Sequence, residues 1–192
     1  MTSPIRAFLA IPLPESPRAR ILELCRQLAH DLPQVRWNSG QNLHLTLKFF
    51  AAIEEESLEK IGEVMLSVGR FTAPFSLRIK GLGAFPNLTR PRVFWLGIDG
   101  DRALRQLHRE LETGLSIYGF APDQRPFAPH LTLGRPRGVL HDAGSILAQR
   151  QPGVDLEWPV DQLILYQSLL LPAGARHLPH RVVQLQGDSR PS

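Results

Sequence analysis

Apolar residues along this chain follow two spacings that alternate from one end of the sequence to the other. Short runs rich in branched and aromatic residues predict strands, and recurrence every three or four positions predicts helices with one buried face. The predicted strands cover 5–11, 35–37, 43–50, 75–79, 93–98, 130–136, 155–158, 162–171 and 181–186, and the predicted helices cover 15–32, 55–70, 102–118 and 140–149. Asp101 and Gly119 are the expected caps of the third helix, and 81–91 is an expected loop because it contains two glycines and two prolines.

The tetrapeptide His-Leu-Thr-Leu occurs twice, at 44–47 and again at 130–133. Side chains alternate between the two faces of a strand, so the histidine and threonine of each copy share one face and the leucines share the other. One such tetrapeptide is ordinary strand sequence, and a lone histidine in it is most often structural. Two identical copies favour a functional pair, because adjacent strands would then direct two imidazoles into one groove.

Each copy of the motif follows a predicted strand and a predicted helix, so the order β-α-β occurs twice. We interpret this order as an internal duplication within one two-lobed domain that spans 1–192. The expected class is α+β: a bilobal fold in which two pseudo-symmetric antiparallel sheets line a central cleft, with helices on the outside. Low-complexity sequence and long linkers between the halves are lacking.

The composition fits a folded cytoplasmic protein with an anionic partner. The apolar share of 43% is enough for a core, and no apolar run approaches the ~18 residues of a membrane span. The first residues lack a signal-peptide pattern, and the single Cys25, on the apolar face of a predicted helix, is expected to be buried. The net charge of +4 and the pI near 9.8 come mostly from arginine. That bias favours RNA or a phosphate ester as partner, although genomic base composition explains it equally well.

Two facing imidazoles suit an in-line displacement at phosphorus. A neutral imidazole can take a proton from water, and an imidazolium can give one to the leaving oxygen. Thr46 and Thr132 can donate hydrogen bonds to phosphate oxygens, and Arg135, near the end of the second motif strand, can neutralise charge in the transition state. None of these steps requires a metal or another cofactor.

Other catalytic chemistries have weaker support in the sequence. A zinc site needs at least three protein ligands, whereas each motif offers one imidazole and no carboxylate or thiol adjoins it. The nucleophile elbow Gly-x-Ser-x-Gly is lacking, as are the glycine-rich loops of nucleotide-binding folds.

Four stretches together, FLAIPLP near the start, VRW, NLHLTLKF and RPFAPHLTLGR, make the chain resemble the two-histidine (2H) phosphoesterase superfamily. Within it the chain is most similar to the bacterial RNA 2′,3′-cyclic phosphodiesterases, also called 2′-5′ RNA ligases. The resemblance implies metal-independent hydrolysis of 2′,3′-cyclic phosphate ends to 2′-phosphomonoesters, with His44 as proton donor and His130 as proton acceptor. It also implies a reverse reaction that joins such an end to a 5′-hydroxyl.

The partner implied by the resemblance is RNA with 2′,3′-cyclic phosphate ends, tRNA fragments among the candidates, bound by a monomer. Trp37, Phe127 and Phe8 are candidates for stacking on a terminal base, with a core role as the alternative. Arg125, before the second motif, is a candidate substrate contact or a solvated side chain. His108, at the edge of a leucine stripe, is expected to be structural.

Two further functions stay open at the level of sequence. One is an RNA-end binding module without turnover, although a pure binder would not need a second imidazole. The other is a phosphodiesterase for a small cyclic nucleotide or an ADP-ribose-derived ester. The basic pI favours RNA over these small substrates without excluding them.

Overall fold

The computed structural model describes residues 4–38, 40, 42–99, 102–140, 143–150, 155–172 and 174–188. Its strands are β1 (Ile5–Pro12), β2 (Val35–Trp37), β3 (His44–Ile53), β4 (Phe75–Phe85), β5 (Val93–Ile98), β6 (His130–Pro136), β7 (Glu157–Val160), β8 (Gln162–Leu171) and β9 (Gly174–Gln184). Its helices are α1 (Glu15–Asp31), α2 (Glu55–Phe71), α3 (Arg102–Ile117) and α4 (Gly144–Arg150). All pairings between these strands are antiparallel, which confirms the expected α+β class.

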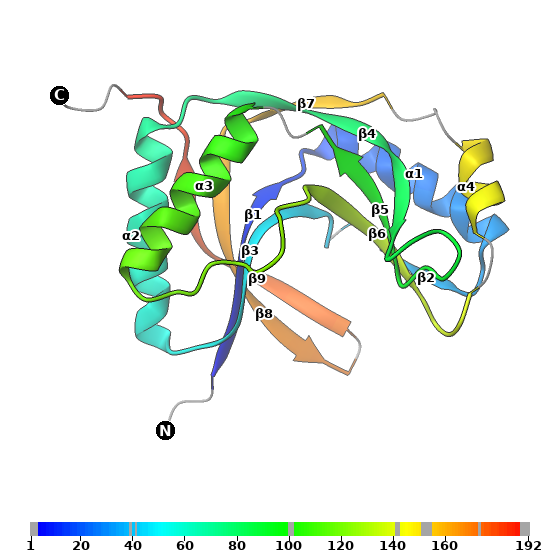
Figure 1. Ribbon diagram of the computed structural model, residues 1–192, viewed down its shortest axis with the longest axis horizontal. Helices are drawn as coiled ribbons and strands as arrows, with labels where there is room; N and C mark the ends of the chain where they lie inside the picture. Colours follow the sequence, from blue (N-terminus) through cyan, green and yellow to red (C-terminus); the bar gives the residue numbers. More distant parts are fainter. Residues whose placement is uncertain are drawn as a thin grey trace.

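The strands hydrogen-bond in the order β7-β4-β5-β6-β3-β1-β8-β9, and β2 is joined to β6 beside β3. The sheet curls strongly, and the helices lie outside the curl, with α2 and α3 at one end and α1 and α4 at the other (Figure 1). The two motif strands, β3 and β6, are therefore the central neighbours of the sheet. The strand order is mirrored about them, with three further strands on either side.

The expectation of two separate sheets is wrong, because the strands form one connected sheet. The connection at its centre is narrow: β3 and β6 share the register pair Leu45 and Leu131. Beyond that pair β3 continues along β1, while β6 pairs with β5 and β2. The two halves are therefore joined by backbone pairing between the two motif strands, β3 and β6, and are not separated by a cleft between two sheets.

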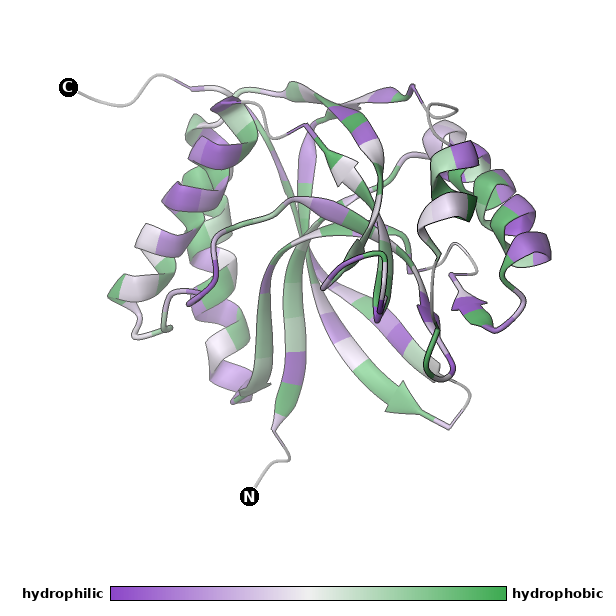
Figure 2. Ribbon diagram, turned by 45° about the vertical axis from the view of Figure 1, so that its right-hand side comes forward, coloured by the Kyte–Doolittle hydropathy of each residue, from purple (hydrophilic) through white to green (hydrophobic). Residues whose placement is uncertain are grey.

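The helices pack on the sheet through the apolar faces that the sequence predicts. The leucine stripe of α3 is fully buried: Leu104, Leu107, Leu111 and Leu115. Figure 2 shows hydrophobic positions on the helix sides that face the sheet and hydrophilic positions outside. Gly119 follows α3 with φ +82°, the left-handed conformation expected of a C-terminal cap, whereas Asp101 lies outside the described residues. None of the described helices is long and apolar enough to cross a membrane.

Several predicted boundaries differ from the observed ones, and in β4 and β9 strand pairing extends past the local sequence signals. β4 continues to Phe85 through part of the expected loop at 81–91, because a register shift after Ile79 absorbs the glycines and β5 remains paired. At Gly83 the ring of Trp95 lies where a Cβ would be. β9 begins at Gly174 instead of 181, since β8 pairs with it along its whole length. α4 and β7 begin a few residues later than expected.

Candidate active site

The two motifs occupy equivalent places on β3 and β6. Their leucines are almost fully buried, and their histidines and threonines are partly exposed on the opposite face, which confirms the predicted alternation. We call the side with the histidines and threonines the motif face, and the opposite side the core face. Extending the register of Leu45 with Leu131 by one residue each way sets His44 opposite Thr132 and Thr46 opposite His130. The two histidines are then diagonal neighbours, about 7–8 Å apart, with their Cβ atoms somewhat closer.

Each motif strand carries a β-bulge directly after its threonine. On β3, Leu9 pairs with Lys48 and Ala10 with Thr46, so Leu47 is the extra residue. On β6 the register shifts in the same way and Leu133 is the extra residue. A bulge exchanges the faces of the residues that follow it.

The bulges decide which side chains follow the threonines onto the motif face. After Leu133, Gly134 lies on the core face beside Trp37, and Arg135 lies exposed on the motif face. After Leu47, Lys48 is buried and Phe49 is exposed. Strict alternation would have directed Arg135 to the core face, so the bulge is what brings this predicted phosphate ligand to the side of the histidines.

Aromatic rings surround His44. Phe8 stacks on its ring with centroids 4.6 Å apart, and Tyr166 in turn stacks on Phe8 at 5.1 Å. The ring of His177 on β9 makes a T-shaped contact with that of His44, with centroids 5.5 Å apart. Phe8 is buried between its neighbours, so the structure places this candidate as the support of the His44 ring.

The surroundings of His44 hold it in the neutral form. Burial among the rings, followed by the like charge of His177, lowers the pKa of His44 from 6.5 to about 4. Burial also lowers the pKa of His177. In the free protein at neutral pH, both side chains are therefore uncharged.

His130 has a different environment, which orients its ring. Its Nδ1 lies 2.7 Å from the carbonyl oxygen of Ala128. A carbonyl only accepts, so Nδ1 carries the hydrogen, and Nε2 of the neutral ring is left with its lone pair. The ring of Phe85 meets that of His130 edge to face at 5.1 Å. In its neutral form His130 can therefore accept a proton at Nε2.

Two of the candidate stacking residues are packed into the core. Trp37 stacks on Phe94 at 5.5 Å, and its Nε1–H donates to the carbonyl of Leu32. Phe127 stacks on His108 with centroids 3.9 Å apart. Both arrangements fit the core alternative. Arg125 is exposed in the segment before β6.

Lys48 is a buried residue that the sequence pattern did not single out. Its ammonium lies 2.7 Å from Glu112 Oε1 and 3.5 Å from Asp123 Oδ1, and it donates to the carbonyl of Ala121 at 2.9 Å. The sequence does contain a signal for this role, since Lys48 stands between a leucine and two phenylalanines in a buried strand. A buried ammonium requires hydrogen-bond acceptors.

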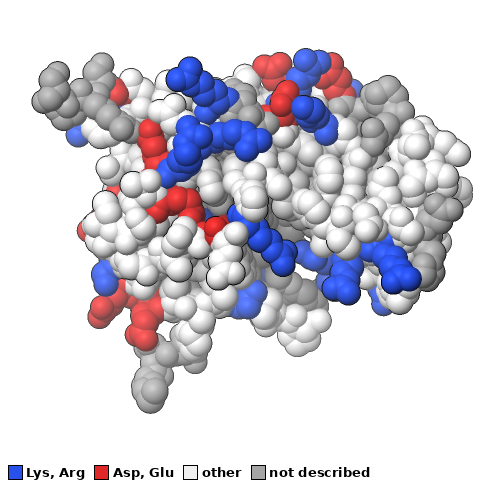
Figure 3. Space-filling model, viewed as in Figure 1, with Lys and Arg blue, Asp and Glu red and all other residues white. Residues whose placement is uncertain are grey.

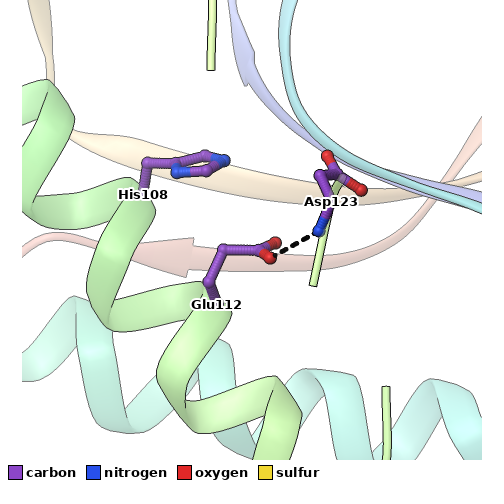
Figure 4. A group of neighbouring side chains, drawn as sticks. All are labelled: His108, Glu112 and Asp123. Carbon is purple, nitrogen blue, oxygen red and sulfur yellow. Dashed lines mark hydrogen bonds between the residues drawn. The ribbon is translucent and has the colours of Figure 1, made fainter. Parts of the chain in front are cut away.

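His108, Glu112 and Asp123 lie close enough together to hold a metal ion (Figure 4). The Lys48 ammonium already supplies the positive charge between the two carboxylates. A divalent ion would have to displace it. The group also lies on the core face of β3, away from the motif histidines, so we assign it a structural role in holding the segment before β6 to α3.

Comparison with known proteins gives consistent matches along nearly the whole chain. A sequence model of the 2′-5′ RNA ligase superfamily matches residues 13–170. The RNA 2′,3′-cyclic phosphodiesterase of Methanothermobacter thermautotrophicus is 34% identical over 183 residues, which cover 94% of this chain and 99% of that protein. The protein of the same name from Thermotoga maritima is 33% identical over 170 residues, covering 88% and 90%.

Solved structures share the fold. The protein TT0787 of Thermus thermophilus superimposes with a TM-score of 0.80 at 27% identity, over 96% of this chain and all of that one. E. coli LigT complexed with 3′-AMP gives a TM-score of 0.76 at 27% identity, over 95% and 98%. The sequence match and the shared fold confirm the resemblance that the paired motifs suggested. The chain therefore belongs to the 2′-5′ RNA ligase superfamily of 2H phosphoesterases.

Proposed function

We propose that this protein hydrolyses 2′,3′-cyclic phosphate ends of RNA to 2′-phosphates by acid–base catalysis with His44 and His130. The observation that carries the proposal is the pairing of β3 with β6 at Leu45 and Leu131, which sets the two imidazoles at diagonal positions, each opposite the threonine of the other motif. The relatives named RNA 2′,3′-cyclic phosphodiesterase support the choice of substrate.

In the proposed reaction, His130 acts first as the base. Its Nε2 takes a proton from a water molecule, whose oxygen attacks the phosphorus of the cyclic ester. The bond from phosphorus to the 3′ oxygen breaks, and His44 protonates that oxygen, leaving a 2′-phosphate and a 3′-hydroxyl. Hydrogen bonding of Nδ1–H to Ala128 supports the role of His130, because it stabilises the imidazolium that forms.

His44 must be protonated to act as the acid, whereas its free-state environment favours the neutral ring. The anionic phosphate of the substrate favours the charged imidazolium, so substrate binding raises the pKa of His44. Thr46 and Thr132 donate hydrogen bonds to the phosphate oxygens, and Arg135 balances the charge that develops there. The proton donor is then charged only when a phosphate is present.

Replacement of the attacking water by a 5′-hydroxyl would join two RNA ends by a 2′-5′ linkage through the same steps. Hydrolysis prevails in dilute solution, since water is in large excess. We further propose that the protein acts as a monomer on RNA ends such as those of tRNA fragments. We also propose that it is one domain whose two halves arose by duplication. The mirrored strand order about β3 and β6 supports the duplication.

The test is hydrolysis of a short RNA that ends in a 2′,3′-cyclic phosphate, in excess EDTA, with the phosphate position of the product determined. The wild type should yield the 2′-phosphate, and His44→Ala and His130→Ala should each lower kcat by about 100-fold or more. His30→Ala, which changes an exposed histidine at the end of α1, is the matched control and should retain full activity. Loss of wild-type activity in EDTA, or turnover of mononucleotide cyclic esters only, would contradict the proposal.

A further inference from the structure

Arg36 on β2 and Arg135 on β6 are direct register partners. Both side chains are exposed. Their neighbours Val35 and Trp37 pack into the core, and the Cβ position of Gly134 is walled by these two side chains. Arg36 therefore shares the motif face with Arg135, and the two side chains extend from directly opposite positions of β2 and β6.

Two like charges directly opposite each other on adjacent strands destabilise a sheet unless something neutralises them. Neither guanidinium forms an ion pair with any carboxylate of the described residues. The three segments that meet here, 33–38, 86–97 and 130–140, contain no aspartate or glutamate at all. The positive charge of Arg36 and Arg135 is thus not neutralised by any carboxylate of the described residues.

Further arginines extend the charge around the pair. Arg90 and Arg92 in the loop between β4 and β5, and Arg137 after β6, are also exposed. Figure 3 shows basic side chains gathered over the region of β2, the end of β6 and this loop, without acidic side chains among them. The opposite half of the motif face differs: the residue that follows the bulge there, in the place of Arg135, is the aromatic Phe49.

The position of the pair relative to the histidines limits what it can bind. His44 and Thr132 form one row across the two strands, and Arg36 and Arg135 form a row three residues further along β6. Leu133 is the extra residue of the bulge and adds no step, so at 3.3 Å per residue the rows are about 7 Å apart. Both arginines therefore lie one row away from His44 and Thr132 on the motif face, Arg135 on β6 and Arg36 on β2, which joins β6 beside β3.

We propose that Arg36, together with Arg135, binds the phosphodiester that links the terminal nucleotide to the preceding one, and so makes this enzyme prefer RNA over mononucleotides. The inference rests on the proposed function and specifies its substrate as an oligonucleotide. Guanidinium groups bind phosphate oxygens in a bidentate manner, and a shared phosphate removes the repulsion between the two arginines. The row formed by Arg36 and Arg135 also sets the direction in which the bound RNA chain extends away from its cyclic end at the histidines.

The test compares two substrates: a nucleoside 2′,3′-cyclic phosphate without a 5′ phosphate, and an RNA tetranucleotide with the same cyclic end. Arg36→Gln should lower kcat/KM for the tetranucleotide about 10-fold, mainly through KM, and should leave the mononucleotide reaction within about 2-fold of wild type. Arg36→Lys should restore part of the loss. Arg109→Gln, an exposed change on α3, is the control and should alter neither reaction.

A binding measurement keeps the inference testable without turnover. Anisotropy of a labelled tetranucleotide with a 2′-phosphate end should show weaker binding to Arg36→Gln, with a salt dependence reduced by about one ion released. Equal losses for the two substrates, or unchanged affinity and salt slope, would overturn the inference. Absence of wild-type turnover on both substrates would instead refute the proposed function, and the anisotropy result would still decide the role of Arg36.

Discussion

The rings of His177 and His44 form a T-shaped contact, with 5.5 Å between the centroids. The two residues come from strands that are not neighbours, because β1 and β8 separate β3 from β9. Burial lowers the pKa of both histidines. A positive charge on His177 further lowers the pKa of His44. This contact links the protonation of the catalytic candidate to a residue outside both motifs.

The contact predicts how His44 titrates. In the free protein its ring should titrate near pH 4, followed by NMR of the histidine Cε1–H signals with His44→Ala for assignment. His177→Phe keeps an aromatic ring but removes the like charge, so it should raise the midpoint. A bound 2′-phosphate should also raise it. A midpoint near 6.5 in the free wild type, the ordinary value for histidine, would contradict the buried environment of His44.

The same shift predicts a loss of stability in acid. The pKa of His44 is lower in the folded state than its ordinary value of ~6.5, so the unfolded chain takes up the proton more readily. The stabilisation is complete above pH ~6.5 and declines as the pH falls toward 4. His44→Phe has no such proton to bind, so its free energy of unfolding in urea should fall less than that of the wild type between about pH 7 and 4. Parallel declines for the two proteins would refute the prediction.

Gly134 is required by the close approach of β2. A Cβ there would lie 2.9 Å from Trp37 Cε3 and 3.0 Å from the carbonyl oxygen of Arg36. Gly134→Ala should therefore lower the free energy of unfolding by about 2 kcal/mol, measured by urea denaturation. Gly138→Ala adds the same methyl group where no heavy atom lies within 4 Å, and should have little effect. Equal stabilities of the two variants would show that β2 can move away at no cost.

Lys48 stabilises the protein through its buried contacts with Glu112 and Asp123. Lys48→Met keeps the length of the side chain but leaves the Glu112 carboxylate without its cation, so it should destabilise the fold by about 3 kcal/mol. Adding Glu112→Gln should recover part of that loss. Lys60→Met, an exposed change on α2, provides the control in the same thermal or urea unfolding experiment. If Glu112→Gln recovers none of the lost stability, the destabilisation by Lys48→Met comes from packing and not from the unpaired charge.

Cys25 lies buried on α1, and burial raises the pKa of its thiol to about 12. The thiolate is the reactive form, so alkylation by iodoacetamide at about pH 8 should be very slow in the native protein. It should become rapid once denaturant unfolds the chain. Mass spectrometry of samples quenched over time measures both rates, and fast labelling without denaturant would contradict the buried position.

The local pattern of residues was sufficient for most elements. Periodicity placed α1, α2, α3, β1, β5 and β8 close to their observed bounds, because each buries one continuous apolar face or run. Strands that form only because a neighbouring strand supplies their hydrogen bonds were predicted less accurately. β9 contains two histidines, two arginines and a proline, and it becomes a strand because β8 supplies its hydrogen bonds from end to end.

The local sequence was enough to predict two His-x-Thr motifs in strands with their leucines inward, and the resemblance gave the superfamily to which the chain belongs. The surroundings of the two motifs depend on contacts between distant segments. The bulges at Leu47 and Leu133 arise from pairing with β1 and β5, and they send Arg135 to the motif face and Lys48 to the core. His177 and Arg36 join the site by pairing between segments that are not adjacent in sequence. Side-chain alternation is a local property of a strand, whereas register depends on the partner strand, and the positions of these four residues follow from register.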